Sequence, residues 1–144
     1  LARGDTVIGF DSLNDYYDVT LKQARLARFI DHPNYIHVQA DLADRAAVEQ
    51  VFAHHKPERV INLAAQAGVR YAAENPHVYA SSNITGFLHV LEGCRQHGCE
   101  HLVFASTSSV YGADTPVPFA PALEAAFLPG LPTLLAAARK LATY

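Results

Sequence analysis

Acidic and hydroxyl side chains follow predicted strands at several places in this 144-residue chain. Asp11 follows the apolar run TVIGF (6–10), Asp41 follows YIHVQA (35–40), and a cluster of hydroxyls, STSS, ends the run HLVFAS (101–106). Because ligands of open parallel sheets bind beyond the carboxyl ends of the strands, these residues are the candidates for chemistry. Carboxylates can accept hydrogen bonds from ribose hydroxyls, and a hydroxyl cluster can contact an anion or a sugar.

Each of these features also has a purely structural explanation. Asp11 could cap a helix or shape a turn, and Asp41 could begin the turn before its helix. Ala64 and Ala65 are small enough to let a ligand approach the backbone, but small residues also simply pack. A Ser/Thr-rich turn needs no ligand. Both kinds of explanation stay open on the residues alone.

Strands that alternate with helices predict the framework that positions these residues. Further strands are expected at 59–65 (RVINLAA) and 101–106, with helices between the strands. Such an order predicts an α/β fold in which helices cover both faces of a parallel sheet.

Local signals place the helices. Leu26, Phe29 and Ile30 share one face of a helix expected over 20–30. Asp44 is expected to cap a second helix, and Pro57 to end it. A long third helix is expected to end near Gly98. Its buried face is predicted to comprise Ile84, Phe87, Leu88 and Leu91.

Composition excludes several classes of function. The net charge of −3 argues against a nucleic-acid surface, which needs clustered Lys and Arg. No apolar run reaches the length of about 18 residues that spans a bilayer, and no signal-peptide pattern opens the chain. Cys94 and Cys99 suggest a reducing compartment, so we predict a cytoplasmic location.

The spacing of Cys94, His97, Cys99 and His101 invites a zinc interpretation. These residues span a predicted helix end and strand start, so their side chains are expected to diverge. We therefore predict no metal site.

The chain changes character after Gly112. Five of the eight prolines lie between Pro116 and Pro132, and an Ala-rich helix is expected to follow. We predict one α/β domain over 1–144, with a regular part over 1–112 and a divergent part over 113–144.

Four stretches together resemble a known family: FDSLNDYYDVTLKQARL, NLAAQAGVRYAAENP, SSNITGFLHVLEGCR and FASTSSVYGA. They are similar to the NAD-dependent epimerases and dehydratases of the extended short-chain dehydrogenase/reductase superfamily, and most closely to UDP-glucuronate 4-epimerases. The resemblance runs from about residue 4 to about residue 119.

The resemblance implies a partial NAD(P)-binding domain over 1–144 with a Rossmann-like fold. It also implies NAD as cofactor and a UDP-sugar as substrate. It assigns cofactor contacts to Asp11, Asn14, Asp15, Asp41, Leu42, Leu63, Ala64, Ala65, Asn83 and Ser106. Tyr16 would lie in the same loop as Asn14 and Asp15. Thr107 and Ser108 match the catalytic hydroxyls of the family, and Ser109 is expected near the substrate. The charge and location of Arg70 suggest a contact with an anionic substrate or an ordinary surface arginine, and both explanations stay open. The family also implies a homodimer through the helix at 83–97.

Two parts of the family pattern are absent from this sequence. No GxGxxG turn precedes Asp11, so we expect a fragment that lacks the first strand and the Gly-rich turn. The family's Tyr-x-x-x-Lys pair aligns with Leu135 and Arg139, and a leucine cannot abstract a proton.

These absences have consequences for fold and function. The family's first strand lies between the strands at 6–10 and 59–64, so those strands should have unpaired facing edges or rearrange. Three functions remain open: an inactive part of a UDP-sugar 4-epimerase or related dehydratase, a non-catalytic nucleotide- or partner-binding protein, and a structural domain. Binding of NAD separates the first two from the third.

Overall fold

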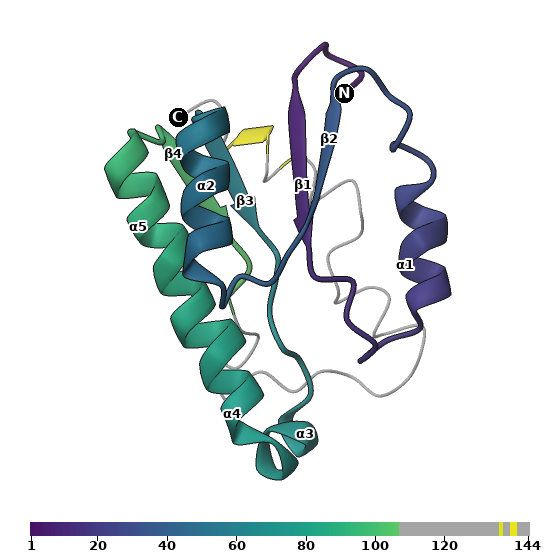
Figure 1. The fold of residues 1–144 in the computed structure, drawn as a ribbon, viewed down its shortest axis with the longest axis vertical. Coiled ribbons are helices and arrows are strands. Elements are labelled where there is room, and N and C mark those ends of the chain that lie inside the picture. The colour runs from purple at the N-terminus through teal and green to yellow at the C-terminus, as the bar shows by residue number, and fades with distance from the viewer. Residues whose placement is uncertain (107–135, 137–138, 141–144) are drawn as a thin grey trace. The chain divides into compact units, whose positions relative to one another are not determined.

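The computed structural model describes residues 1–106, 136 and 139–140 (Figure 1). The chain divides into two compact units, Leu1–Val103 and Phe104–Tyr144. The first unit contains nearly all of the described elements. The fold is α/β, as the alternation of strands and helices predicts.

Four strands and the helices between them follow the predicted order. The strands are β1 (Val7–Asp11), β2 (Tyr35–Gln39), β3 (Arg59–Asn62) and β4 (His101–Phe104). The helices are α1 (Val19–Leu26), α2 (Arg45–His55), α3 (Val69–Glu74), α4 (Pro76–Tyr79), the π-helix η1 (Ala80–Gly86) and α5 (Phe87–His97). Among the described residues no helix is both long and apolar enough to cross a membrane.

Two signals for helix ends are confirmed. Asp44 caps α2, since its carboxylate accepts hydrogen bonds from the N–H groups of Ala46 and Ala47. Gly98 ends α5 in the left-handed conformation with φ of 69°. The first helix is shorter than predicted: α1 ends at Leu26, and Phe29 and Ile30 lie beyond it with 40% and 43% of their surface exposed.

The described strands form two separate two-stranded sheets. β1 pairs with β2 in parallel register, with Val7 opposite Tyr35 and Asp11 opposite Gln39. β3 pairs with β4, and within the described part of the chain β1 and β3 are not paired with each other. Among the described residues, β1 and β3, which the resemblance predicts to flank a central strand, therefore each pair with one strand only.

The core of the first unit lies under α2 and α5. Val48, Phe52 and Val90 are its fully buried apolar residues. Side chains from three strands pack against this cluster: Phe10, Val60 and Leu102. α2 and α5 run side by side in Figure 1, with α1 on the far side of the β1–β2 pair. Few of the described residues are buried, so the core that the structure describes is small.

The predicted buried face of the long helix is wrong in part. Ile84, Leu88 and Leu91 are 69%, 53% and 41% exposed, whereas Val90 and Gly93 are buried. A Cβ at Gly93 would lie 2.5 Å from the Phe52 ring, so a glycine lets α5 approach α2 closely. The helix therefore packs through small residues and leaves its larger apolar stripe exposed.

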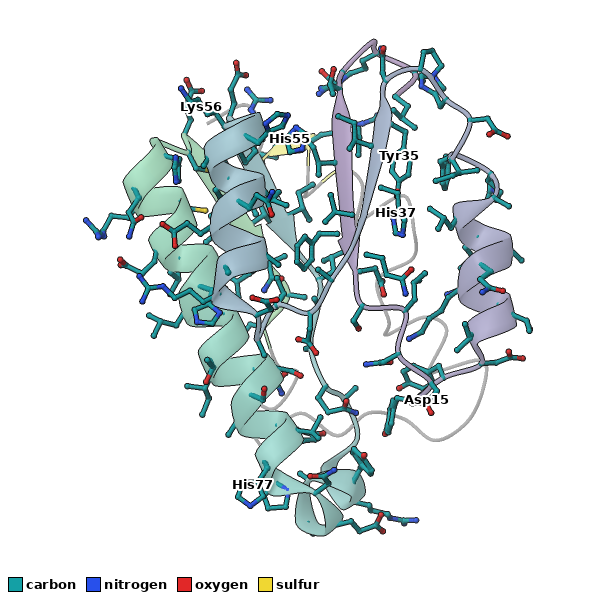
Figure 2. The ribbon with its side chains drawn as sticks, viewed as in Figure 1. Asp15, Tyr35, His37, His55, Lys56 and His77 are labelled. Atoms are coloured by element: carbon teal, nitrogen blue, oxygen red, sulfur yellow. The ribbon has the colours of Figure 1, made fainter. Side chains whose placement is uncertain are left out.

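His37 lies on the face of β2 that is turned away from α2 and α5. Its ring stacks beside that of Tyr35 (Figure 2). The Tyr35 ring in turn lies next to that of Phe29, with centroids 6.2 Å apart. Both ring nitrogens of His37 are buried without a hydrogen-bond partner in the described part of the chain. A buried polar atom without a partner costs about 1–3 kcal/mol.

Replacing His37 by leucine is therefore expected to raise the free energy of unfolding by about 1 kcal/mol. His32→Leu is the matched control, because the Nδ1 atom of His32 accepts a hydrogen bond from the N–H of Asn34 at 3.1 Å. That variant should be less stable than the wild type. Urea denaturation measures both changes, and a less stable H37L protein would contradict the interpretation.

Candidate functional site

Asp11 ends β1 at the carboxyl edge of the first sheet. Its Oδ1 atom accepts a hydrogen bond from the N–H of Leu13 at 2.7 Å, and Leu13 has a φ of 49°. The cap of α1 is Asp18, which accepts from the N–H of Thr20. Asp11 is thus a turn residue and not a helix cap. Its second carboxylate oxygen has no hydrogen-bond partner among the described residues, and the side chain is exposed.

Asp41 repeats this arrangement one strand away. Its Oδ1 atom accepts from the N–H of Ala43 at 2.8 Å, while Asp44 caps the following helix. The N–H of Ala40 donates to the carbonyl of Asp11 at 3.2 Å, which carries the pairing just past the strand ends. Two carboxylates therefore follow adjacent parallel strands at one edge of the sheet, as the sequence predicts.

The loop that follows Asp11 is held by Lys22 of α1. The Lys22 ammonium donates to the carbonyl of Asn14 at 2.6 Å and to its Oδ1 atom at 2.8 Å. The side-chain NH₂ of Asn14 stays without a partner in the described part of the chain. Asp15 is exposed beside it (Figure 2). The loop thus presents a carboxylate and an amide donor to solvent next to Asp11.

The segment after β3 is held by Asn83. Leu63 is 71% exposed, Ala64 and Ala65 are exposed, and Gln66 is buried at 7%. Asn83 accepts from the N–H of Gln66 at 2.7 Å and donates to its carbonyl at 3.0 Å. The amide of Asn83 is used by the protein backbone. Asn83 therefore holds this segment in place, and its predicted role at the cofactor stays a prediction.

The same helical segment also holds the loop after β2. A Cβ at Gly86 would lie 2.8 Å from the Cβ of Leu42. His89 Nδ1 lies 2.8 Å from the Leu42 carbonyl, and since a carbonyl only accepts, Nδ1 carries the donated hydrogen. Asn83, Gly86 and His89 recur at intervals of three residues. The sequence analysis missed both His89 and Gln66. For His89, its spacing of six residues from Asn83 was a usable signal.

The remaining predicted residues do not join this group. Arg70 is exposed in α3. Ser106 is exposed and belongs to the second unit, and Arg139 is exposed and helical. The predictions for Thr107, Ser108, Ser109 and Leu135 lie outside the described residues.

Two surface hollows lie elsewhere. One of about 200 Å³ is lined by residues of α2 and α5, and one of about 460 Å³ by the end of β2 and α2. None of the predicted site residues lines either hollow.

The Cys99 thiol donates to the carbonyls of Glu58 and His101, each at 3.4 Å. No cluster of metal-binding side chains occurs among the described residues.

The comparisons with known proteins decide the family. The family model described as GDP-mannose 4,6 dehydratase matches residues 1–129. The chain belongs to the GDP-mannose 4,6 dehydratase family. The match covers most of the chain, including both carboxylates and the segments that Asn83 and His89 hold.

Relatives within the GDP-mannose 4,6 dehydratase family include UDP-glucuronate 4-epimerases. UDP-glucuronate 4-epimerase 3 of Arabidopsis thaliana is 48% identical over 118 residues, which is 81% of this chain and 27% of the relative. UDP-glucuronate 4-epimerase of Thermodesulfobacterium geofontis is 46% identical over 116 residues, 81% of this chain and 36% of the relative. The chain spans about a third of the bacterial relative's length. The predicted resemblance is confirmed.

Solved structures agree on the fold. UDP-glucose 4-epimerase of Thermotoga maritima, crystallised with UDP-glucose, matches with a TM-score of 0.63 at 30% identity and covers 81% of this chain and 35% of that one. UDP-glucose-4-epimerase of Stenotrophomonas maltophila, with bound NAD and formylated UDP-arabinopyranose, matches with a TM-score of 0.65 at 28% identity. That match covers 99% of this chain and 42% of the other. The Rossmann-like prediction is confirmed.

Proposed function

We propose that this chain forms the adenosine side of an NAD site in a nucleotide-sugar 4-epimerase whose substrate is UDP-glucuronate. The observation that carries the proposal is the pair Asp11 and Asp41 at the ends of adjacent parallel strands, each ordered by its own turn. The identity with UDP-glucuronate 4-epimerases supports the sugar.

The residues present fit the adenosine half of NAD. Asp11 keeps one free carboxylate oxygen in the described part of the chain, and a ribose hydroxyl is a suitable donor to it. Asn14 offers an amide donor beside it. Leu42 is half-buried against the core next to Asp41, and we assign it to the border of the adenine ring. Leu63, Ala64 and Ala65 are exposed for contact with the rest of the cofactor.

The sequence does not supply every part of a catalytic site. NAD, when bound, accepts a hydride from the sugar and returns it. A phenol must take the proton from the sugar hydroxyl, and the resemblance places Leu135 at the position of that tyrosine. We therefore propose that the residues of this chain bind cofactor and that they do not by themselves supply the base. Thr107, Ser108, Ser109 and Arg70 stay predictions for the sugar side.

A related dehydratase is the second candidate, because the family model carries that description. The sequence relatives favour the epimerase.

A cytoplasmic location is part of the proposal, and the free thiols Cys94 and Cys99 support it. The exposed stripe of Ile84, Leu88 and Leu91 supports a homodimer through the helical segment 83–97.

Calorimetric titration of NAD into the 144-residue chain tests the proposal. We expect NAD to bind, and Asp11→Asn to raise the dissociation constant about 10–100-fold, because a hydrogen bond to a charged group is worth about 1.5–3 kcal/mol. The same change should reduce the preference for NAD over NADP. The Asp11 carboxylate repels the extra phosphate of NADP, and D11N removes that repulsion.

Asp31→Asn is the matched control. Asp31 is exposed and precedes β2, so it lies at the opposite edge of the parallel sheet from Asp11. Five-residue strands separate these edges by about 16 Å. D31N removes the same charge and should leave NAD affinity within about twofold of wild type. Equal losses in both variants, or no binding to the wild type, would contradict the proposal.

A further inference from the structure

Tyr16 lies in the loop after β1 but contacts the segment after β3. Its ring centroid is 4.9 Å from that of Tyr71 in α3, with the planes tilted by 47°. Figure 1 shows the turn between β1 and α1 at the same end of the first unit as α3. The two segments are more than 50 residues apart in the sequence. Tyr16 thus joins parts of the unit whose strands belong to different two-stranded sheets.

Gly68 provides the seat for the Tyr16 phenol. It has a φ of 97°, and a Cβ on it would lie 2.5 Å from the Tyr16 hydroxyl oxygen. The next nearest atoms would be 3.7 Å and 3.8 Å away, which is ordinary contact. Two features therefore restrict residue 68 to glycine: its positive φ and the close approach of the Tyr16 phenol.

Other tyrosines surround the Tyr16 ring. Tyr17 packs edge-on against it with centroids 4.7 Å apart, although Tyr17 itself is 60% exposed. Burial, followed by the nearby phenols of Tyr17, Tyr79 and Tyr71 and the Glu74 carboxylate, raises the pKa of Tyr16 above its usual value. The hydroxyl therefore stays protonated at neutral pH, and Tyr16 acts through packing and not through charge.

The other contacts of this loop are hydrogen bonds within the loop and to the start of α1. Asp11 binds the N–H of Leu13, Lys22 binds Asn14, and Asp18 binds Thr20. All of these hydrogen bonds fall within residues 11–22. They shape the loop but do not fix its distance from the segment at 63–68. Among the described contacts, it is the packing of the Tyr16 ring that fixes this distance.

We propose that Tyr16 is a positioning residue that sets the distance between the Asp11 loop and the segment Leu63–Gly68, and with it the width of the NAD site. This inference rests on the proposed function, since both segments are assigned to the cofactor. A site held at the right width needs no ordering when the ligand binds, which improves affinity. Tyr16 needs no contact with NAD to have this effect.

Alanine substitution tests the effect on affinity. Tyr16→Ala should weaken NAD binding about 3–10-fold, the range that an aromatic pair contact is worth. Tyr16→Phe keeps the ring and should stay within about twofold of wild type, as should Tyr17→Ala, which removes the exposed neighbour and leaves the ring on Gly68. Unchanged affinity in Y16A, with only the melting temperature lowered, would overturn the positioning role.

A double-mutant cycle tests the contact between Tyr16 and residue 68 without any cofactor. Gly68→Ala introduces the collision with the Tyr16 hydroxyl and also backbone strain at the positive φ. In a Tyr16→Phe background the hydroxyl is absent, while the strain is unchanged. Thermal melts should therefore show a smaller loss from G68A in Y16F than in wild type.

The two experiments fail in different ways. An additive cycle would show that Tyr16 is not seated on Gly68 and would overturn the inference, whether or not NAD binds. A coupled cycle in a chain that binds no NAD would contradict the proposed function, and the positioning of the cofactor would fall with it.

Discussion

Replacing Asn83 by leucine is expected to lower the free energy of unfolding by about 2–4 kcal/mol. The Asn83 amide makes hydrogen bonds to both backbone groups of Gln66, a residue that is 7% exposed. Leucine has a similar shape but leaves a buried N–H and a buried carbonyl without partners. Each unpaired group costs about 1–3 kcal/mol, so the loss is large for a domain with so small a core.

Asn75→Leu is the control for this change. The amide of Asn75 makes one long hydrogen bond, of 3.4 Å to the Tyr71 hydroxyl. Its loss should cost less than about 1 kcal/mol. Chemical denaturation gives both values, and hydrogen exchange of the Gln66 amide should accelerate only in N83L. Equal destabilisation by the two variants would contradict the role assigned to Asn83.

Replacing Gly93 by alanine is expected to destabilise the protein by about 1–2 kcal/mol, even though alanine favours a helix by about 1 kcal/mol over glycine. The new Cβ would lie 2.5–2.7 Å from three carbons of the Phe52 ring, including Cγ at its root. Phe52 is 5% exposed, so the ring has little room to move. The overpacking therefore outweighs the gain in helix propensity.

Phe52→Leu provides the test of this mechanism. Combined with G93A it should give a protein that loses less stability than the sum of the two single changes, because the smaller side chain makes room for the Cβ. A thermal melt is sufficient, since about 1 kcal/mol shifts the melting temperature of a domain near this size by about 4–8 °C. A G93A protein more stable than wild type would contradict the close packing of α2 on α5.

The sequence predicts those features that are encoded locally. Asp44 as a helix cap and Gly98 as a helix end were both predicted, since each signal acts within a few residues. Asp11 and Asp41 were expected after strands, and the structure separates their turn role from the caps provided by Asp18 and Asp44.

The buried face of α5 was not predicted because its contacts are long-range. The periodicity of Ile84, Leu88 and Leu91 is that of an apolar stripe, but the stripe is exposed. Gly86 and Gly93 carry no hydrophobic signal, yet they are where the helix approaches Leu42 and Phe52 most closely. Periodicity shows that a helix has an apolar face, but it does not show which neighbour covers it.

The contacts of the two adjacent tyrosines were also missed. Tyr16 was expected only to shape its loop. Its contacts with Gly68 and Tyr71 depend on how the chain brings distant segments together. A glycine just before a helix, as Gly68 is, was the one local sign of a close approach.

The most direct test of the central claim is a thermal melt of the 144-residue chain with NAD, with ADP-ribose and with nicotinamide mononucleotide, each at millimolar concentration. The described carboxylates are assigned to the adenosine half of the cofactor. NAD and ADP-ribose should therefore both raise the melting temperature, and nicotinamide mononucleotide should have little effect. A melting temperature that none of the three ligands changes would contradict the claim that this chain forms the adenosine side of an NAD site.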